Sequence, residues 1–291
     1  MKKPVKISRD ESHLAVKIRM LRVDDAGDPT NLADATAFVW EANGTWFLVS
    51  NLHNFTGWNY VESKSLSDTG ASPTHLEVSL GAYHKRLSDN KFLFGKKGYT
   101  LSLTVDDKPK WLVHPVFGTN VDVGVLEICD VPNAEEYEKI GISKFATIPA
   151  NRHDWVHYEP AAGDDAFVLG YPHGMECQGL PIWKRASIAT EPDMDLDGLP
   201  KLLLDTATRK GMSGSPVIGV RRGIVHPSGE MGDDSIFGES MNFLGVYSGR
   251  IGDDPLGVQL GIVWKASVIE EIIEGGRKGE WPWIKESNDE T

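Results

Sequence analysis

Residues 36–51 read TAFVWEANGTWFLVSN, the clearest hairpin pattern in the chain. Two runs rich in β-branched and aromatic residues flank Asn43-Gly44, and Asn-Gly is the strongest short-range signal for a two-residue hairpin turn. Similar short runs recur outward from this hairpin, at residues 75–83, 99–105, 123–129, 166–171, 184–190, 201–207, 215–220, 242–249 and 258–264. Many short strands separated by turns indicate an all-β sandwich or barrel, which is the fold class that we expect.

Helical patterns are sparse. Residues 131–141 are polar and could form a short linking helix. Residues 267–279 give a better pattern, in which Ser267 caps the helix, Glu270 completes a capping box and Gly275-Gly276 stop it. The stretch from about 131 to 150 separates two β-rich halves. We therefore place one domain at 12–135 and a second at 145–276.

The composition excludes several classes of protein. Of the 291 residues, 40% are hydrophobic and 25% are charged, which is typical of a globular protein and not of a disordered one. The net charge of −12 disfavours binding to the phosphate backbone of nucleic acids. Residues 4–16 contain no uninterrupted apolar region, and no segment approaches the roughly 18 apolar residues of a membrane span. We expect a cytoplasmic protein that binds neither nucleic acid nor membrane, with Cys129 and Cys177 as free thiols.

Residues 211–217 read GMSGSPV and carry the sharpest chemical signal. Glycines on both sides of Ser213 let the backbone bend tightly and let a substrate approach closely. A serine presented in this way can act as a nucleophile. The amides of Gly211 and Ser213 can point at one spot, as the paired donors of an oxyanion hole do. The alternative is an ordinary Gly-Ser turn between two strands.

A serine nucleophile needs a general base, and the base needs a carboxylate that orients it. His53 lies at the end of the second hairpin strand, where a rigid element can deliver a side chain to a rim. Asp122 stands at the start of an apolar run, where it can be shielded and can hold an imidazole. The alternatives are a polar turn residue at 53 and a strand-start residue without a partner at 122.

These three segments resemble the trypsin-like (chymotrypsin-fold) serine peptidases, and most closely their bacterial glutamyl-endopeptidase-like and Deg-type members. The matching residues are SNLH (50–53) around His53, DVGVL (122–126) at Asp122 and GMSGSPV around Ser213, in the family's chain order. Weaker markers agree, namely DTA (205–207), GYP (170–172) and LGIVWKASVIEEII (260–273). The resemblance covers residues 34–275.

The resemblance implies two antiparallel six-stranded β-barrels with a C-terminal helix. The first barrel would carry His53 and Asp122, and the second would carry Ser213. It implies a serine endopeptidase without a cofactor or metal, in which Ser213 attacks a carbonyl, His53 moves the proton and Asp122 orients His53. The amides of Gly211 and Ser213 would form the oxyanion hole. The partner would be a protein or peptide substrate.

The residues that would determine substrate specificity are harder to predict from the sequence. The resemblance places Ala207 and Thr208 at the base of the primary substrate pocket. It places Tyr247, Ser248, Gly249 and Arg250 in the pocket wall, where they would pair with the substrate as an added strand. A floor aspartate is missing, which disfavours a preference for Lys or Arg. The nearby cations Arg209, Lys210 and Arg250 would attract an acidic side chain, or they are ordinary solvated surface charges.

Two residues depart from the family pattern, and the second bears on activation. Gly124 replaces the usual alanine in the aspartate strand, and Met212 replaces the acidic or amide residue often found before the serine. In family members that are activated by cleavage, an aspartate before the serine forms an ion pair with the newly released N-terminus. Met212 cannot form this ion pair. We therefore expect an enzyme that is latent until an activating protein partner binds, or one that is narrowly specific.

Other readings remain open at this point. A catalytically silent fold could bind a protein partner, and the same triad could hydrolyse esters. The pair His153 and His157 has the spacing of a helical metal site, and residues 193–198 match the opening of a calcium loop but lack its final glutamate. An α/β-hydrolase is set aside, because its histidine follows the serine at a distance, and the only histidine after Ser213 is the nearby His226.

Overall fold

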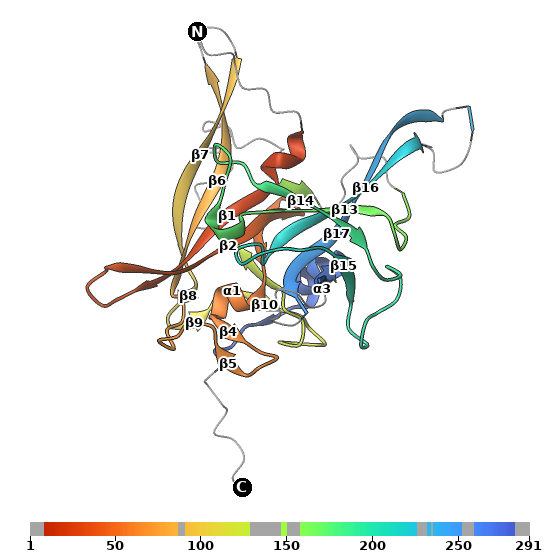
Figure 1. Ribbon diagram of the computed structural model, residues 1–291. Coiled ribbons are helices and arrows are strands. Elements are labelled where there is room, and N and C mark those ends of the chain that lie inside the picture. The colour runs from red at the N-terminus through yellow and green to blue at the C-terminus, as the bar shows by residue number, and fades with distance from the viewer. Residues whose placement is uncertain are drawn as a thin grey trace.

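The computed structural model describes residues 9–86, 91–128, 147–149, 158–225, 232–233, 235–251 and 259–282 (Figure 1). The expected helix at 131–141, the pair His153 and His157, Cys129 and His226 lie outside these residues. The described residues form β-strands with few helices, so the all-β fold class is confirmed.

The hairpin at Asn43-Gly44 begins the first of two β assemblies. Strands β2 (Pro29–Ala42) and β3 (Thr45–Ser50) pair antiparallel, with Ala42 opposite Thr45. Asn43 and Gly44 have φ values of 52° and 76°, and two positive φ angles are what a two-residue hairpin turn requires. Alternation along β2 sends Phe38 and Trp40 to one core and Ala37 and Val39 to another, so both faces of the hairpin are buried.

The first assembly is a nine-stranded sheet in the order β19-β10-β11-β3-β2-β1-β6-β7, with β12 paired to β2. Its other strands are β1 (Ala15–Val23), β6 (His75–Arg86), β7 (Lys91–Ser102), β10 (Leu112–Val113), β11 (Gly124–Glu127), β12 (Thr147–Pro149) and β19 (Arg277–Lys278). Two small hairpins lie beside it: β4 (Trp58–Asn59) with β5 (Lys64–Ser65), and β8 (Thr104–Val105) with β9 (Lys108–Pro109).

The expected closure of the first barrel is not seen. Leu76 of β6, Leu101 of β7 and Leu126 of β11 share one core, so the sheet curls around its own apolar residues. Its edges do not pair with each other in the described residues, because β7 bonds only to β6 and the opposite edge is occupied by β19. The described residues thus form a nine-stranded sheet in this half, and the prediction of a closed six-stranded barrel here is not confirmed.

The second assembly is a closed six-stranded barrel, as expected for this half of the chain. Its order is β13-β14-β15-β18-β17-β16. The strands are β13 (Asp165–Gly170), β14 (Ile182–Ile188), β15 (Lys201–Asp205), β16 (Ser215–Val225), β17 (Ile236–Arg250) and β18 (Leu260–Lys265). Their neighbours are all antiparallel.

The helices are short. They are α1 (Leu52–Thr56), α3 (Ser267–Gly275) and the 3₁₀ turns η1 (Asp10–His13) and η3 (Pro172–Gly174). Helix α3 ends at Gly275, so the predicted stop at Gly275-Gly276 is confirmed. Its N-cap is Ala266 and Ser267 is already helical, so the predicted serine cap is wrong. None of the helices in the described part of the chain is long and apolar enough to cross a membrane.

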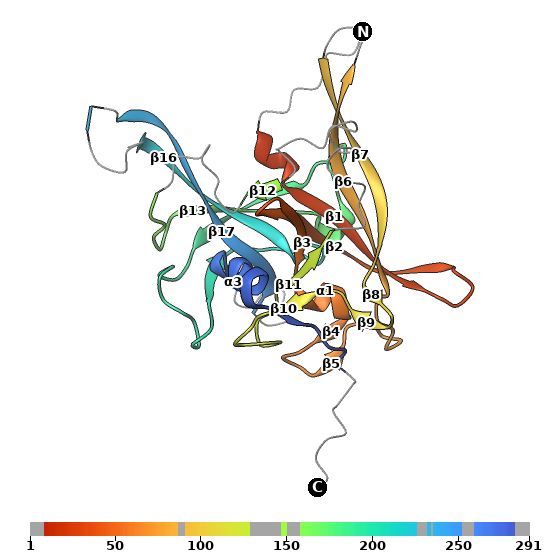
Figure 2. The same cartoon turned by 180° about the vertical axis from the view of Figure 1, so that it is seen from behind.

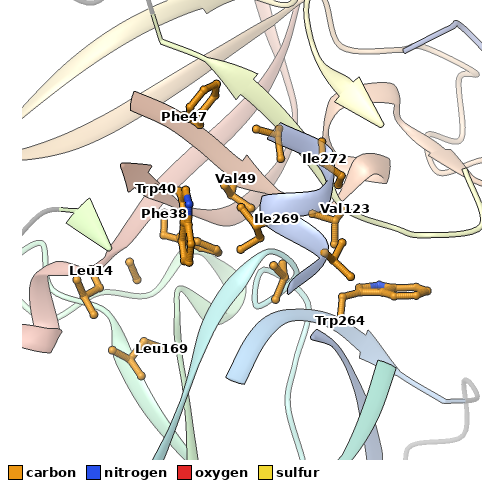
Figure 3. Packing of buried hydrophobic residues seen from close by; sticks show 14 of the residues in the cluster. Leu14, Phe38, Trp40, Phe47, Val49, Val123, Leu169, Trp264, Ile269 and Ile272 are labelled. Carbon is orange, nitrogen blue, oxygen red and sulfur yellow. The ribbon is translucent and has the colours of Figure 1, made fainter. Parts of the chain in front are cut away.

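The sheet, the barrel and α3 share one hydrophobic core. Figure 3 shows Phe38 and Val49 of the sheet, Leu169 and Trp264 of the barrel and Ile269 of α3 packed together. All five are at most 5% exposed. Burial of a large apolar side chain contributes about 1.5–3 kcal/mol, so this shared core fixes the sheet against the barrel. The domain limits of 12–135 and 145–276 stay a prediction.

A strap of residues 277–282 returns from α3 to the first sheet. Strand β19 pairs with β10, and the Gly279 amide donates to the carbonyl of Trp111 at 2.9 Å. Trp281 packs edge-on against Trp111, with ring centroids 4.9 Å apart. Figure 2 shows α3 beside β10 and β11, where the strap leaves the helix.

A buried amine lies where the sheet meets the barrel. Lys96 of β7 donates from Nζ to the Tyr171 hydroxyl at 2.6 Å, and that hydroxyl donates to the carbonyl of Ala15 at 3.0 Å. Burial of the ammonium lowers the pKa of Lys96 to about 8. Lys96 therefore costs stability while it is charged.

This contact predicts an unusual pH dependence of stability. Between about pH 8 and its ordinary pKa of 10.5, the folded state binds fewer protons at Lys96 than the unfolded state does. The free energy of unfolding should therefore rise with pH over this window, by about 2–3 kcal/mol relative to Lys96→Met. Urea denaturation of both proteins at pH 7.5, 9 and 10.5 measures the difference. Lys97→Met is the control, because Lys97 is exposed; equal pH slopes for all three proteins would contradict the prediction.

Candidate active site

His53 and Asp122 meet because their strands are neighbours. Helix α1 follows β3 directly and carries His53, while Asp122 lies just before β11. Strands β3 and β11 pair antiparallel, with Ser50 opposite Gly124. The end of β3 therefore lies beside the start of β11, as the sequence analysis required.

The contact between the two side chains is direct and doubled. His53 Nδ1 lies 2.7 Å from Asp122 Oδ2, and the His53 amide donates to Asp122 Oδ1 at 3.0 Å. The ring and the carboxylate are 19% and 23% exposed. An ionised carboxylate at Nδ1 places the ring proton there, so the Nε2 atom of the neutral ring keeps its lone pair. Nε2 is then the atom that can accept a proton.

Ser248 also belongs to this pair. Its hydroxyl donates to Asp122 Oδ2 at 2.5 Å, from strand β17 of the barrel. The sequence analysis placed Ser248 only in the substrate-binding wall, so this contact was missed. Nothing in the local sequence around residue 248 could have indicated it, because the two residues are 126 positions apart.

The loop that carries Ser213 lies against the residue after His53. Asn54 Nδ2 donates to the Ser213 carbonyl at 3.3 Å and to Ser50 Oγ at 2.9 Å. None of the hydrogen bonds of the described residues joins Ser213 Oγ to His53 Nε2. Nucleophile–base hydrogen bonds are often long in unliganded enzymes and tighten when the substrate binds. The structure thus brings His53 and Asp122 into contact and places the Ser213 backbone beside α1.

Two amides of this loop have no acceptor. The amides of Met212 and Gly214 donate to the carbonyls of Arg209 and Tyr247, whereas those of Gly211 and Ser213 donate to nothing in the described residues. These are the two amides that the sequence analysis assigned to an oxyanion hole. Free, fixed N–H groups of this kind can stabilise a developing oxyanion.

The carbonyls of the same loop are anchored. The Lys210 carbonyl accepts from the His173 amide at 2.7 Å, and the Met212 carbonyl accepts from the Ser215 amide at 3.1 Å. The C=O and N–H of a trans peptide point in opposite directions. Each anchored carbonyl therefore turns the following amide, Gly211 or Ser213, away from its anchor.

Gly211 must be glycine at this point. Its φ is 93°, and an added Cβ would lie 2.4 Å from the Tyr171 carbonyl oxygen. The glycine is thus required both by the backbone conformation and by the close approach of the loop to residue 171.

The predicted pocket residues lie together at the end of the barrel core. The hydroxyl of Thr208 is hydrogen-bonded to that of Tyr247, and both residues are buried. The Tyr247 ring packs against Gly261, where an added Cβ would lie 2.5 Å from Cε2. Burial raises the pKa of Tyr247 to about 12, so its hydroxyl stays neutral at ordinary pH. Ala207 is half-buried beside them in the chain.

Among the described residues, no strand pairs with the outer edge of β17 next to this loop. Pairing of β17 with β16 ends at Ser215 opposite Tyr247, while Gly249 and Arg250 pair only with β18. An unpaired strand edge can accept an extended peptide. Among the described residues no carboxylate pairs with the side chains of Arg209, Lys210 and Arg250.

The glycine that departs from the family pattern has a packing reason. An added Cβ on Gly124 would lie 2.6 Å from Cδ2 of Phe55, a buried residue of α1. Phe55 in turn lies 6.3 Å from Trp111, between ring centroids. The larger aromatic side chain in α1 thus takes the space that an alanine would need.

Gly124→Ala should therefore be destabilising, by about 1–3 kcal/mol, because it overpacks Phe55. The double variant Gly124→Ala with Phe55→Leu should recover part of this loss, since leucine is smaller. Urea denaturation measures both. Gly98→Ala is the matched control, because an added Cβ there has nothing within 4 Å. A Gly124→Ala protein as stable as the control would show that Phe55 does not confine this position.

The rival calcium loop has other partners. Asp195 and Asp197 form ion pairs with Lys265 at 2.7 Å and with Lys201 at 3.0 Å. No group of three or more metal-ligating side chains occurs in the part of the chain that the structure describes. These acidic residues therefore act as an exposed, lysine-paired loop in the observed structure.

Comparisons with known proteins add little to this geometry. No protein-family model and no curated protein matches the chain. One solved structure that matches is the active form of the Rv3671c protease from M. tuberculosis, at 18% sequence identity. The match covers 93% of this chain and 84% of that chain, with a TM-score of 0.42.

Proposed function

We propose that the chain is a trypsin-like serine endopeptidase, with Ser213 as nucleophile, His53 as general base and Asp122 as the group that orients His53. The observation that carries the proposal is the doubled His53–Asp122 contact beside the Ser213 loop. The acceptor-free amides of Gly211 and Ser213 support it as the oxyanion hole. Ser248 adds a third donor to the Asp122 carboxylate.

The mechanism follows from these positions. His53 Nε2 takes the proton from Ser213 Oγ while Oγ bonds to the carbonyl carbon of the substrate. The carbonyl oxygen of the substrate becomes negative and accepts hydrogen bonds from the amides of Gly211 and Ser213. The C–N bond then breaks, and the proton on Nε2 goes to the leaving amine. Water repeats the sequence on the acyl-enzyme, which releases the acid and restores Ser213.

We propose a narrow specificity for this site. The protein or peptide substrate would add a strand to the free edge at Ser248, Gly249 and Arg250. Ala207, Thr208 and Tyr247 would border its primary side chain. The hydroxyl pair of Thr208 and Tyr247 already fills buried space there, which favours a small side chain at this position.

Intact-mass analysis after treatment with a fluorophosphonate probe tests the proposal. We expect one adduct on the wild-type chain, and peptide mapping should place it on Ser213. A chain that stays unlabelled at neutral pH, both alone and with candidate protein partners, would overturn the peptidase proposal in favour of a silent fold that binds a protein partner. A labelled chain that cleaves ester but not peptide substrates would instead indicate an esterase.

A further inference from the structure

Thr36 joins the first sheet to the Ser213 loop through its amide and its hydroxyl. Its amide donates to the Ser213 carbonyl at 3.0 Å, and its hydroxyl donates to the Gly211 carbonyl at 2.7 Å. The hydroxyl also accepts from the Tyr171 amide at 3.1 Å, and the Thr36 carbonyl accepts from Ser50 Oγ at 2.7 Å. Thr36 is fully buried on β2.

These bonds complete a set. All four successive carbonyls from Lys210 to Ser213 are now held. The amides of His173 and Ser215 hold the first and the third, the Thr36 hydroxyl holds the second, and the Thr36 amide and Asn54 Nδ2 hold the fourth. The Thr36 hydroxyl fixes the Gly211–Met212 peptide, which links the two peptides that carry the Gly211 and Ser213 amides, so a rearrangement of the loop between these amides would have to break this bond. Thr36 of β2 and Asn54 of α1 lie outside both the loop and the barrel, and Thr36 is the one that bonds the Gly211 carbonyl.

The surroundings are shaped for this hydroxyl. An added Cβ on Gly170 would lie 2.9 Å from Thr36 Oγ1 and 2.1 Å from Ser215 Oγ. Glycine at 170 therefore clears the space, and the next residue, Tyr171, supplies the amide that the hydroxyl accepts. This gives a physical reason for the Gly170-Tyr171-Pro172 motif that the sequence analysis noted only as a marker.

The residue before the nucleophile offers no alternative anchor. Met212 is 1% exposed and packs in the barrel core with Val217 and Tyr247. An apolar side chain in this place can form no ion pair, so the loop is not ordered by a charge at residue 212. We propose that Thr36 is the positioning residue that holds the oxyanion-hole amides toward the substrate, a role that rests on the proposed function.

Thr36→Val tests this role, because valine keeps the shape and removes the hydroxyl. For the folded variant we expect kcat and the rate of fluorophosphonate labelling to fall about 10–100-fold with KM within about twofold, since only the oxyanion stabilisation is weakened. Thr36→Ser keeps the hydroxyl and should restore the rate to within about threefold of wild type. Thr30→Val, at an exposed position of the same strand, should leave the rate unchanged. Thr36→Cys, of similar size but with a weakly bonding thiol, replaces the valine variant if the latter does not fold.

A crystal structure of each variant reports the loop independently of activity. We expect the Gly211–Met212 peptide, whose carbonyl the Thr36 hydroxyl holds, to keep its orientation in Thr36→Ser and to lose it in Thr36→Val. A folded Thr36→Val protein with wild-type kcat and an unchanged loop would overturn the role of Thr36. A wild-type chain that is never labelled would overturn the peptidase function, while the orientation of the peptides in the variants would still decide whether Thr36 holds the loop.

Discussion

Ser213→Ala should lower kcat for a cleavable peptide by about 10⁶-fold and abolish fluorophosphonate labelling. The methyl side chain cannot attack the carbonyl, while the His53–Asp122 contact and the anchors of the loop do not involve the Ser213 hydroxyl. KM should change little, because the free edge of β17 and the residues around Thr208 are untouched. Steady-state kinetics with saturating peptide measures both constants.

The control for this variant is Ser187→Ala. Ser187 is a half-buried serine of β14, in the barrel but away from the Ser213 loop, and its loss should leave kcat unchanged. Residual cleavage by Ser213→Ala at more than about a thousandth of the wild-type rate would contradict the assignment of the nucleophile.

Asp122→Asn should lower kcat by about 10⁴-fold with little change in the fold. An amide at this position no longer requires the proton on His53 Nδ1, so the ring can adopt the tautomer in which Nε2 is protonated and cannot act as a base. The asparagine side chain can still form hydrogen bonds with the backbone N–H of His53 and with the Ser248 hydroxyl, which keeps the site assembled. The loss should therefore fall on kcat and not on KM or on the midpoint of urea denaturation.

Asp205→Asn provides the comparison for charge. Asp205 is an exposed residue of β15, so its substitution removes one negative charge without touching His53. If Asp205→Asn and Asp122→Asn had similar rates, the effect would be one of net charge, and the orienting role of Asp122 would be wrong.

The features predicted well from sequence were those with a local cause. The Asn43-Gly44 turn, the strands of the barrel and helix α3 follow from alternation, turn residues and stop signals within a few positions. The contact of His53 with Asp122 was also predictable, because His53 follows the second hairpin strand and Asp122 starts another apolar strand-like run. These elements position the candidate site.

The features that were missed depend on contacts between distant segments. Thr36 lies 175 positions from Gly211, and Ser248 lies 126 from Asp122, so no spacing rule relates them. Strand β19 contains only Arg277 and Lys278, which are exposed and have no apolar alternation. The nine-strand order of the first sheet was missed for the same reason, since the pairing of edges is not decided by the pattern of any one strand.

The strap at 277–282 also fixes the order in which this molecule can be assembled during its synthesis. The ribosome makes the chain from the N-terminus, so β10 and Trp111 emerge long before the residues that cover them. Until β19 arrives, β10 remains a bare edge and the tryptophan that lies against Phe55 of α1 lacks its partner Trp281. A nascent chain cut short before residue 277 thus contains His53, Asp122 and Ser213 but lacks the strand that covers the β10 edge of the first sheet.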